Sequence, residues 1–150
     1  ITVQEASQYI TTYFEEYPRV RKFLDIVTET AKLHGFVETF YGTRRYISGI
    51  NSTNKNVQAQ AVRMAVNTVV QGTAANIIKK VMIELHEEFK NDENIKMLLQ
   101  VHDELIFEVR DEFAKEYMKK IENIMENTVK FKKVPLKANE SVAKNWGLLK

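Results

Sequence analysis

Two short apolar runs, separated by three polar residues, constrain the fold of this chain more than any other feature. The stretch LLQVHDELIFEV, residues 98–109, is almost wholly apolar except near its middle, at His102, Asp103 and Glu104. Apolar, β-branched runs of four or five residues usually form strands buried in a sheet. Because an unpaired buried charge is costly, the pattern predicts a hairpin whose carboxylates need a compensating partner.

The polar residues of this hairpin have several interpretations. Asp103 at the tip could hold a divalent cation through hard oxygen ligands, or it could simply be a turn residue, since aspartate is common in turns. An HD-type phosphohydrolase needs further His and Asp ligands on helices, whereas this HD pair lies between strands. The three histidines (His34, His86 and His102) have no paired spacing, which argues against zinc.

Charge is distributed unevenly along the chain. The formal net charge is only +2, yet the 45 residues between Glu38 and Glu84 contain no Asp or Glu. The same stretch contains six cations: Arg44, Arg45, Lys55, Arg63, Lys79 and Lys80. Such a basic stretch predicts a polyphosphate partner, and the alternative is a chance imbalance on a solvated face.

The first half of the chain predicts two helices and a hairpin. Thr2 with Glu5 three residues later forms a capping box before apolar residues at helical spacing, which end at Pro18. A second helical pattern runs from 20 and stops at Gly35. Residues 36–47 predict a short hairpin with Gly42 in its turn.

The second half mixes helices with strands. A long helical pattern covers 56–89 with Gly72 inside it, where glycine costs about 1 kcal/mol and therefore indicates a close backbone approach or a bend. After the 98–109 hairpin, Asp111 is expected to cap a helix that continues to 129. Residues 134–142 are a last strand candidate. This order of elements predicts an α+β domain.

One face of the long helix is polar without being acidic or lysine-rich. Its residues are spaced 4, 3, 4 and 4 apart and so stack along one side. Amide and guanidinium groups are donors suited to the base-edge acceptors of the DNA minor groove. The alternative is a stripe packed against another part of the protein. We call these residues the polar stripe: Asn56, Gln60, Arg63, Asn67 and Gln71.

Composition excludes several classes of protein. The 150 residues, 44% of them hydrophobic, suffice for a real core. Cysteine is absent, so disulfides and thiolate metal sites are excluded, and no apolar run approaches the roughly 18 residues of a membrane span. No secretory signal is evident, and we expect a cytoplasmic protein. The chain starts at Ile1 rather than Met, so we expect that it has been trimmed or is a piece of something longer.

Two motifs together resemble a known family. The stretch RMAVNTVVQGTAANIIKK, followed by LLQVHDELIFEV, resembles the carboxy-terminal part of family A DNA polymerases, the bacterial polymerase I-like enzymes. GFVETFYGTRRYI and VPLKANESVAKNW fit the same family in the same order, so the resemblance covers essentially the whole chain. It implies an antiparallel palm sheet with a hairpin called motif C, packed with helices that include a long central one.

The resemblance also assigns roles to residues. QVHDE matches motif C, which makes Asp103 a catalytic metal ligand and Glu104 an acidic neighbour, and puts His102 at the primer-terminus end. Arg63, Asn67 and Gln71 match positions that line the minor groove near the growing end. The family's basic GRRR turn matches Thr43, Arg44 and Arg45, with Thr43 replacing one arginine.

The implied chemistry is template-directed DNA synthesis with Mg²⁺. A primer 3′-hydroxyl would attack the α-phosphate of an incoming deoxynucleoside triphosphate in line, in a two-metal site. A primer-template duplex is the implied partner, and the implied location is the bacterial nucleoid. Asn76 stands where the family usually has Asp, which puts an acidic role at that position in doubt.

Other family motifs do not occur in this chain. The second metal-binding aspartate lies in a motif of the type DYSQIE, and the nucleotide-binding fingers helix has the pattern RxxxKxxxFxxxYG; neither matches here. We therefore expect one fragment, with late fingers helices and the DNA-contacting helix at about 1–89 and palm at about 90–150. It would need upstream palm strands and an upstream polypeptide as its partner. The alternative is a non-catalytic DNA-binding or partner-binding module derived from the same fold.

Overall fold

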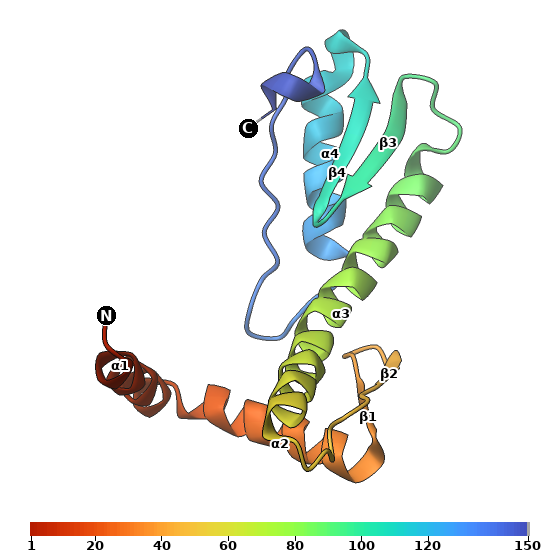
Figure 1. Ribbon diagram of the computed structural model, residues 1–150. Helices are drawn as coiled ribbons and strands as arrows, with labels where there is room; N and C mark the ends of the chain where they lie inside the picture. Colours follow the sequence, from red (N-terminus) through yellow and green to blue (C-terminus); the bar gives the residue numbers. More distant parts are fainter. Residues whose placement is uncertain (150) are drawn as a thin grey trace. The chain divides into compact units, whose positions relative to one another are not determined.

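A computed structural model describes residues 1–149, and their contacts divide the chain into two compact units, Ile1–Thr73 and Ala74–Lys150. The boundary lies within one long helix (Figure 1). Mixed helices, small antiparallel sheets and a long helix confirm the predicted α+β class. No described helix is both long enough and apolar enough to cross a membrane.

The first unit begins with two helices whose ends follow from local sequence. Helix α1, Val3–Glu16, starts with the predicted capping box: the Glu5 N–H donates to Thr2 Oγ1 at 3.2 Å and the Thr2 N–H to the Glu5 carboxylate at 2.7 Å. Helix α2, Pro18–His34, has Pro18 in its first turn, where no N–H is needed. It ends at Gly35, whose φ of 75° is the left-handed cap that glycine adopts most readily.

A short hairpin and the start of the long helix complete this unit. Strands β1, Phe36–Glu38, and β2, Arg44–Tyr46, pair antiparallel, and Gly42 has φ 78° in the connection, as predicted. Helix α3 spans Lys55–Phe89, and the Asn54 side chain accepts the first N–H groups of this helix.

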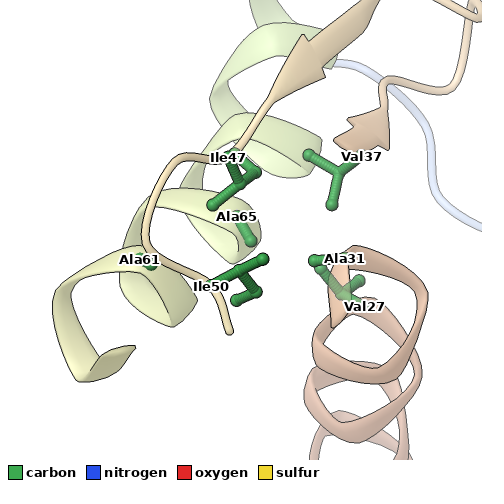
Figure 2. Close-up of a cluster of buried hydrophobic side chains, with 7 residues drawn as sticks. All are labelled: Val27, Ala31, Val37, Ile47, Ile50, Ala61 and Ala65. Carbon is green, nitrogen blue, oxygen red and sulfur yellow. The ribbon is translucent and has the colours of Figure 1, made fainter. Parts of the chain in front are cut away.

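Small side chains let these elements approach closely. Ala31 of α2 and Ala61 and Ala65 of α3 are almost fully buried, so the helix backbones lie near the core (Figure 2). Larger aliphatic residues from α2, β1 and the β2–α3 connection fill the remaining space: Val27, Val37, Ile47 and Ile50. This core fixes the hairpin and the first half of α3 in one unit.

The second unit is a hairpin packed on helices. Strands β3, Ile95–Val101, and β4, Glu104–Val109, pair antiparallel, with a register shift between Met97 and Leu99. A 3₁₀ turn, Asp111–Phe113, leads into α4, Ala114–Asn127, and a second 3₁₀ turn covers Trp146–Leu148. The end of α3, one strand end and α4 supply the core: Val81, Leu85, Phe89, Ile95 and Tyr117.

The prediction that both apolar runs are buried is wrong for the outer face of this sheet. Met97, Leu105 and Phe107 pack on the core, but Leu98 and Leu99 are 52% and 44% exposed. Leu99 pairs with Ile106 on the face opposite to Met97 and Phe107, and Leu98 is the residue left without a ladder partner at the register shift. In the described residues only the inner face of this two-stranded sheet packs on the core.

Two predictions about the end of the chain are also wrong. Asp111 does not cap the following helix: it starts the 3₁₀ turn, its carboxylate pairs with Lys144, and α4 begins three residues later without a side-chain cap. Residues 134–142 form no strand. They run along α4 (Figure 1), where the Glu126 carboxylate accepts from Lys137 Nζ at 3.1 Å and the Ala138 N–H at 3.2 Å. A strand needs a ladder partner, and no described strand pairs with this segment.

Candidate nucleic-acid interface and catalytic hairpin

The polar stripe lies on the solvent side of the first half of α3. Its five members are all exposed, and so are the six cations of the acid-free stretch. Within the described residues the stripe is therefore not packed against another part of the protein, which was the alternative interpretation. Its amide and guanidinium groups are accessible to an external acceptor.

An apolar groove borders the stripe. Val62, Val66 and Val70 of α3 line it together with Leu24 of α2, around a volume of about 600 Å³, and Arg63 and Asn67 stand at its side. A hydrogen bond made beside an apolar surface competes with less water and is electrostatically stronger than one in bulk solvent. The position of the groove therefore favours ordered contacts by these two donors.

Arg44 is held by groups of its own hairpin. Its Nε lies 2.6 Å from the Glu38 carboxylate, and its guanidinium lies over the Phe36 ring at 4.7 Å from the centroid. The hydrogen bond that Arg44 donates to Glu38, and then the charge of that carboxylate, raise the pKa of Arg44 above its usual value. Any phosphate contact by Arg44 must therefore compete with Glu38.

Arg45 extends over α3 instead. Its guanidinium donates to Thr68 Oγ1 at 3.3 Å and contacts Met64 Sδ at 3.3 Å. Met64 and Thr68 are four residues apart and form the column of α3 next to the polar stripe. The structure thus brings Arg45 to the same helix as the stripe. The sequence analysis did not predict Met64 and Thr68 as partners of Arg45. Their spacing of four residues on α3 was the one signal that could have indicated a shared face.

Of the two interpretations of Gly72, a close approach or a bend, the structure shows the close approach. A Cβ built on Gly72 would lie 2.7 Å from Thr39 Cγ2, closer than real Cβ contacts allow. Next to it, the Phe40 N–H donates to Thr73 Oγ1 at 3.0 Å. The β1–β2 connection therefore rests directly on the α3 backbone.

The HDE residues form the exposed turn of the β3–β4 hairpin. Val101 and Glu104 are the last paired residues, and His102 and Asp103 connect them. His102 has φ 56°, the left-handed conformation that costs a non-glycine residue on the order of 1 kcal/mol, and its carbonyl accepts from the Gln100 side chain. Because all three residues are exposed, the expected cost of burying Asp103 does not arise in this unit.

This turn contains part of a metal site at most. Among residues 1–149, no three His, Asp, Glu or Cys side chains gather closely enough to hold an ion. Asp103 and Glu104 line one end of a groove of about 560 Å³, whose walls are β4, α4 and the 137–143 segment. Two accessible carboxylates fit as some of the oxygen ligands of a divalent cation, with the others supplied from elsewhere.

Comparisons with known proteins agree on one family. Residues 1–148 match DNA polymerase family A. The chain is 40% identical over 147 residues to DNA polymerase I of Bacillus caldotenax and 42% identical over 148 residues to that of Caldicellulosiruptor bescii. In each case 97% of this chain covers 17% of the relative's length.

A solved structure gives the same result. The POL domain of Pol1 from M. smegmatis, in complex with DNA primer-template and dNTP, superimposes with a TM-score of 0.84 at 36% identity, over 91% of this chain and 24% of that one. The match of the family over nearly all described residues, with a solved relative of the same fold, shows that this chain belongs to DNA polymerase family A.

Proposed function

We propose that this chain is a carboxy-terminal part of an enzyme that performs template-directed DNA synthesis, transferring nucleotides from deoxynucleoside triphosphates to a primer 3′ end. Its relatives are DNA polymerases I, and the solved relative holds DNA primer-template and dNTP. The chain spans 17% of the relatives' length, so the remaining polymerase polypeptide is its first partner. The relatives are bacterial, which favours a cytoplasmic enzyme acting at the nucleoid.

The observation that carries this proposal is the HDE turn at the exposed tip of a packed hairpin. The inner face of β3 and β4 is anchored in the core, so the backbone that presents Asp103 is held in place, as a preorganised site requires. Asp103 is proposed as a Mg²⁺ ligand, Glu104 as an acidic neighbour, and His102 as a contact at the primer terminus.

Bound Mg²⁺ would supply Lewis-acid stabilisation of the charge that develops in an in-line phosphoryl displacement. The chain's own part is to hold carboxylate oxygens at a fixed place and to orient the duplex. Asp103 alone is insufficient for two-metal chemistry, so at least one further carboxylate is expected from the upstream polypeptide.

Unit 1 is proposed to hold the duplex. Arg63, Asn67 and Gln71 would donate to minor-groove acceptors, which occur at similar places in every correct base pair. Arg44 and Arg45 would contact the phosphate backbone, which dominates affinity. The exposure of all five side chains supports these roles.

We assign the late fingers helices and the DNA-contacting helix to about 1–89 and the palm to about 90–150, as the family's domain order implies. Strand β4 has one edge without a partner among the described strands, beside the 560 Å³ groove. Such an edge is a template for pairing with another strand, so an upstream palm strand is proposed to dock there.

Primer extension by the complete polymerase tests the catalytic proposal. Asp103→Asn keeps the shape but removes the charge, and the rate of nucleotide addition should fall at least about 10³-fold, the scale of losing a key electrostatic stabiliser. Primer-template affinity should change much less. Glu108→Gln is the matched control, because Glu108 is an exposed carboxylate of the same hairpin, on β4. Near-normal turnover of Asp103→Asn would support the non-catalytic alternative instead.

A further inference from the structure

The contact between the β1–β2 connection and α3 has a role that the motifs do not assign. We propose that Thr39 and Gly72 are positioning residues for DNA binding: their close contact seats the hairpin on α3 and thereby fixes the Arg45 guanidinium beside the polar stripe. This inference rests on the proposed contact of Arg45 with DNA.

The connection between the strands is tied together by Thr39. Its buried hydroxyl accepts the N–H groups of Tyr41 at 3.3 Å and Thr43 at 3.2 Å, while its own N–H donates to the Thr43 carbonyl. These bonds fix the rotamer of Thr39, so its methyl group, Cγ2, must point in one direction. That direction is toward Gly72.

Three contacts of the hairpin follow α3 closely. Met64, Thr68 and Gly72 are four residues apart and stack in one column: Arg45 lies over Met64 and Thr68, and Thr39 lies over Gly72. Phe40 is bound to Thr73 beside that column. The hairpin therefore packs on α3 at Gly72 at one end of the column, and it places the Arg45 guanidinium over α3 at the other end.

A side chain at position 72 would push the β1–β2 connection away from α3. Because Thr39 Cγ2 is on a short, buried, β-branched side chain, it cannot swing aside without breaking the hydroxyl bonds. The hairpin must shift, and the weakly held guanidinium of Arg45 at the far end of the column shifts with it. Gly72 is thus required for space, although alanine would favour the helix itself.

Rescue by a smaller partner gives the test, in the complete polymerase. Primer-template Kd is measured over a range of salt concentrations for Gly72→Ala, Thr39→Ser, the double variant of these, Arg45→Ala, and Gly72→Ala with Arg45→Ala. Thr39→Ser removes Cγ2 but keeps the hydroxyl, so it is the reference for the rescue. The KM for deoxynucleotide is measured in parallel.

The expected pattern is specific. Arg45→Ala should raise Kd about tenfold, the scale of one hydrogen bond from a charged group, and lower the salt slope by about 0.9, as for one lost phosphate contact. Gly72→Ala should raise Kd in the same direction and add nothing to Arg45→Ala. Thr39→Ser should restore Kd in the Gly72→Ala background, and the KM for deoxynucleotide should not follow these changes.

Each contrary result has a distinct meaning. If Arg45→Ala changes neither Kd nor its salt dependence, Arg45 does not contact DNA, and both that assignment and this inference fail. Suppose instead that Arg45→Ala raises Kd. The inference alone then fails if Gly72→Ala leaves Kd unchanged, if the effects of the two substitutions on Kd add up, or if Thr39→Ser does not restore Kd in the Gly72→Ala background.

A milder variant covers the case in which Gly72→Ala does not fold. Thr73→Val keeps the shape but removes the hydroxyl that accepts the Phe40 N–H, so it loosens the seat without a clash. It should raise Kd by about two- to fivefold, less than Arg45→Ala, and should also add nothing to Arg45→Ala. Additivity there would overturn the inference equally.

Discussion

Gln71 illustrates how a single neutral side chain can test base pairing. It lies exposed on α3, four residues after Asn67, so both amides face the same side of the helix. Minor-groove acceptors of correct pairs occupy common positions, which a mismatch displaces. An amide at this place can therefore respond to geometry without responding to sequence.

Gln71→Ala in the complete polymerase should slow extension of matched primers several-fold, because a hydrogen bond to an uncharged acceptor contributes roughly 0.5–1.5 kcal/mol. Extension of mismatched primers, where the contact is already broken, should change little. Single-turnover extension from both primer types measures the effect, which should be alike for all four bases. Equal slowing of both primer types, or a strong dependence on base identity, would contradict the minor-groove assignment of the stripe.

Glu104 directly follows Asp103 and is the first residue of β4. It is paired with Val101 in the ladder, whereas Asp103 lies at the tip of the turn, so the two carboxylates project from different backbone positions. Glu104→Gln should therefore reduce the rate of nucleotide addition less than Asp103→Asn does. Pre-steady-state incorporation by both variants decides the order, and a larger defect for Glu104→Gln would reverse the two assignments.

At the scale of elements, a buried tyrosine joins α4 to the α3–β3 connection. The Tyr117 hydroxyl donates to the Asp92 carboxylate, which also accepts the backbone N–H of Asn94 at 3.0 Å. The tyrosine hydroxyl, and then the Asn94 N–H, lower the pKa of Asp92, and the bond to Asp92 raises the pKa of Tyr117. This pair fixes the start of the strand that leads to the HDE turn.

The pH dependence of this pair has a definite sign. A carboxylate with a lowered pKa stabilises the fold fully above its ordinary pKa, and this contribution is lost as the pH falls below about 4. A tyrosine with a raised pKa contributes fully below its ordinary pKa, and this is lost as the pH rises above about 10. The pair therefore stabilises the fold between these limits.

Tyr117→Phe in the complete polymerase should lower the melting temperature by about 2–4 °C at pH 7, the scale of one hydrogen bond. The difference from the parent should shrink as the pH falls from 5 to 3. Thermal denaturation at several pH values measures it, with Tyr9→Phe, an exposed tyrosine of α1, as the control. A difference that is constant over this range would show that lost packing, rather than the bond to Asp92, causes the destabilisation.

At the scale of the whole molecule, each unit leaves apolar surface open. Helix α1 buries none of its residues, and the outer face of β3 exposes Leu98 and Leu99. Exposed apolar faces and free strand edges favour association. The isolated 150-residue chain is therefore expected to be poorly soluble or partly molten.

Primer extension provides the whole-molecule prediction. The purified chain with Mg²⁺, deoxynucleotides and primer-template should show no synthesis, because it contains too few metal ligands. Adding the upstream polypeptide should restore extension if the parts dock, and Asp103→Asn in the added chain should abolish this restoration. Synthesis by the isolated chain would contradict the proposed dependence on upstream residues.

The sequence by itself determined the elements whose signals are local. The capping box at Thr2, the left-handed stop at Gly35, the turn at Gly42 and the period of α3 all act within a few residues. The close approach at Gly72 was also predictable, since glycine inside a helix needs a reason. The HDE turn followed from the two apolar runs that flank it.

Only the tertiary structure decided what depends on distant neighbours. Residues 134–142 carry a strand pattern but lie along α4, because a strand forms only where a ladder partner exists. Asp111 was expected to cap α4, but its carboxylate pairs with Lys144, which is distant in sequence. Thr68, as the partner of Arg45, and Asp92, as the partner of Tyr117, lie 23 and 25 residues away in sequence. Local sequence patterns cannot predict such pairs, because the two residues meet only when the hydrophobic cores around them have packed.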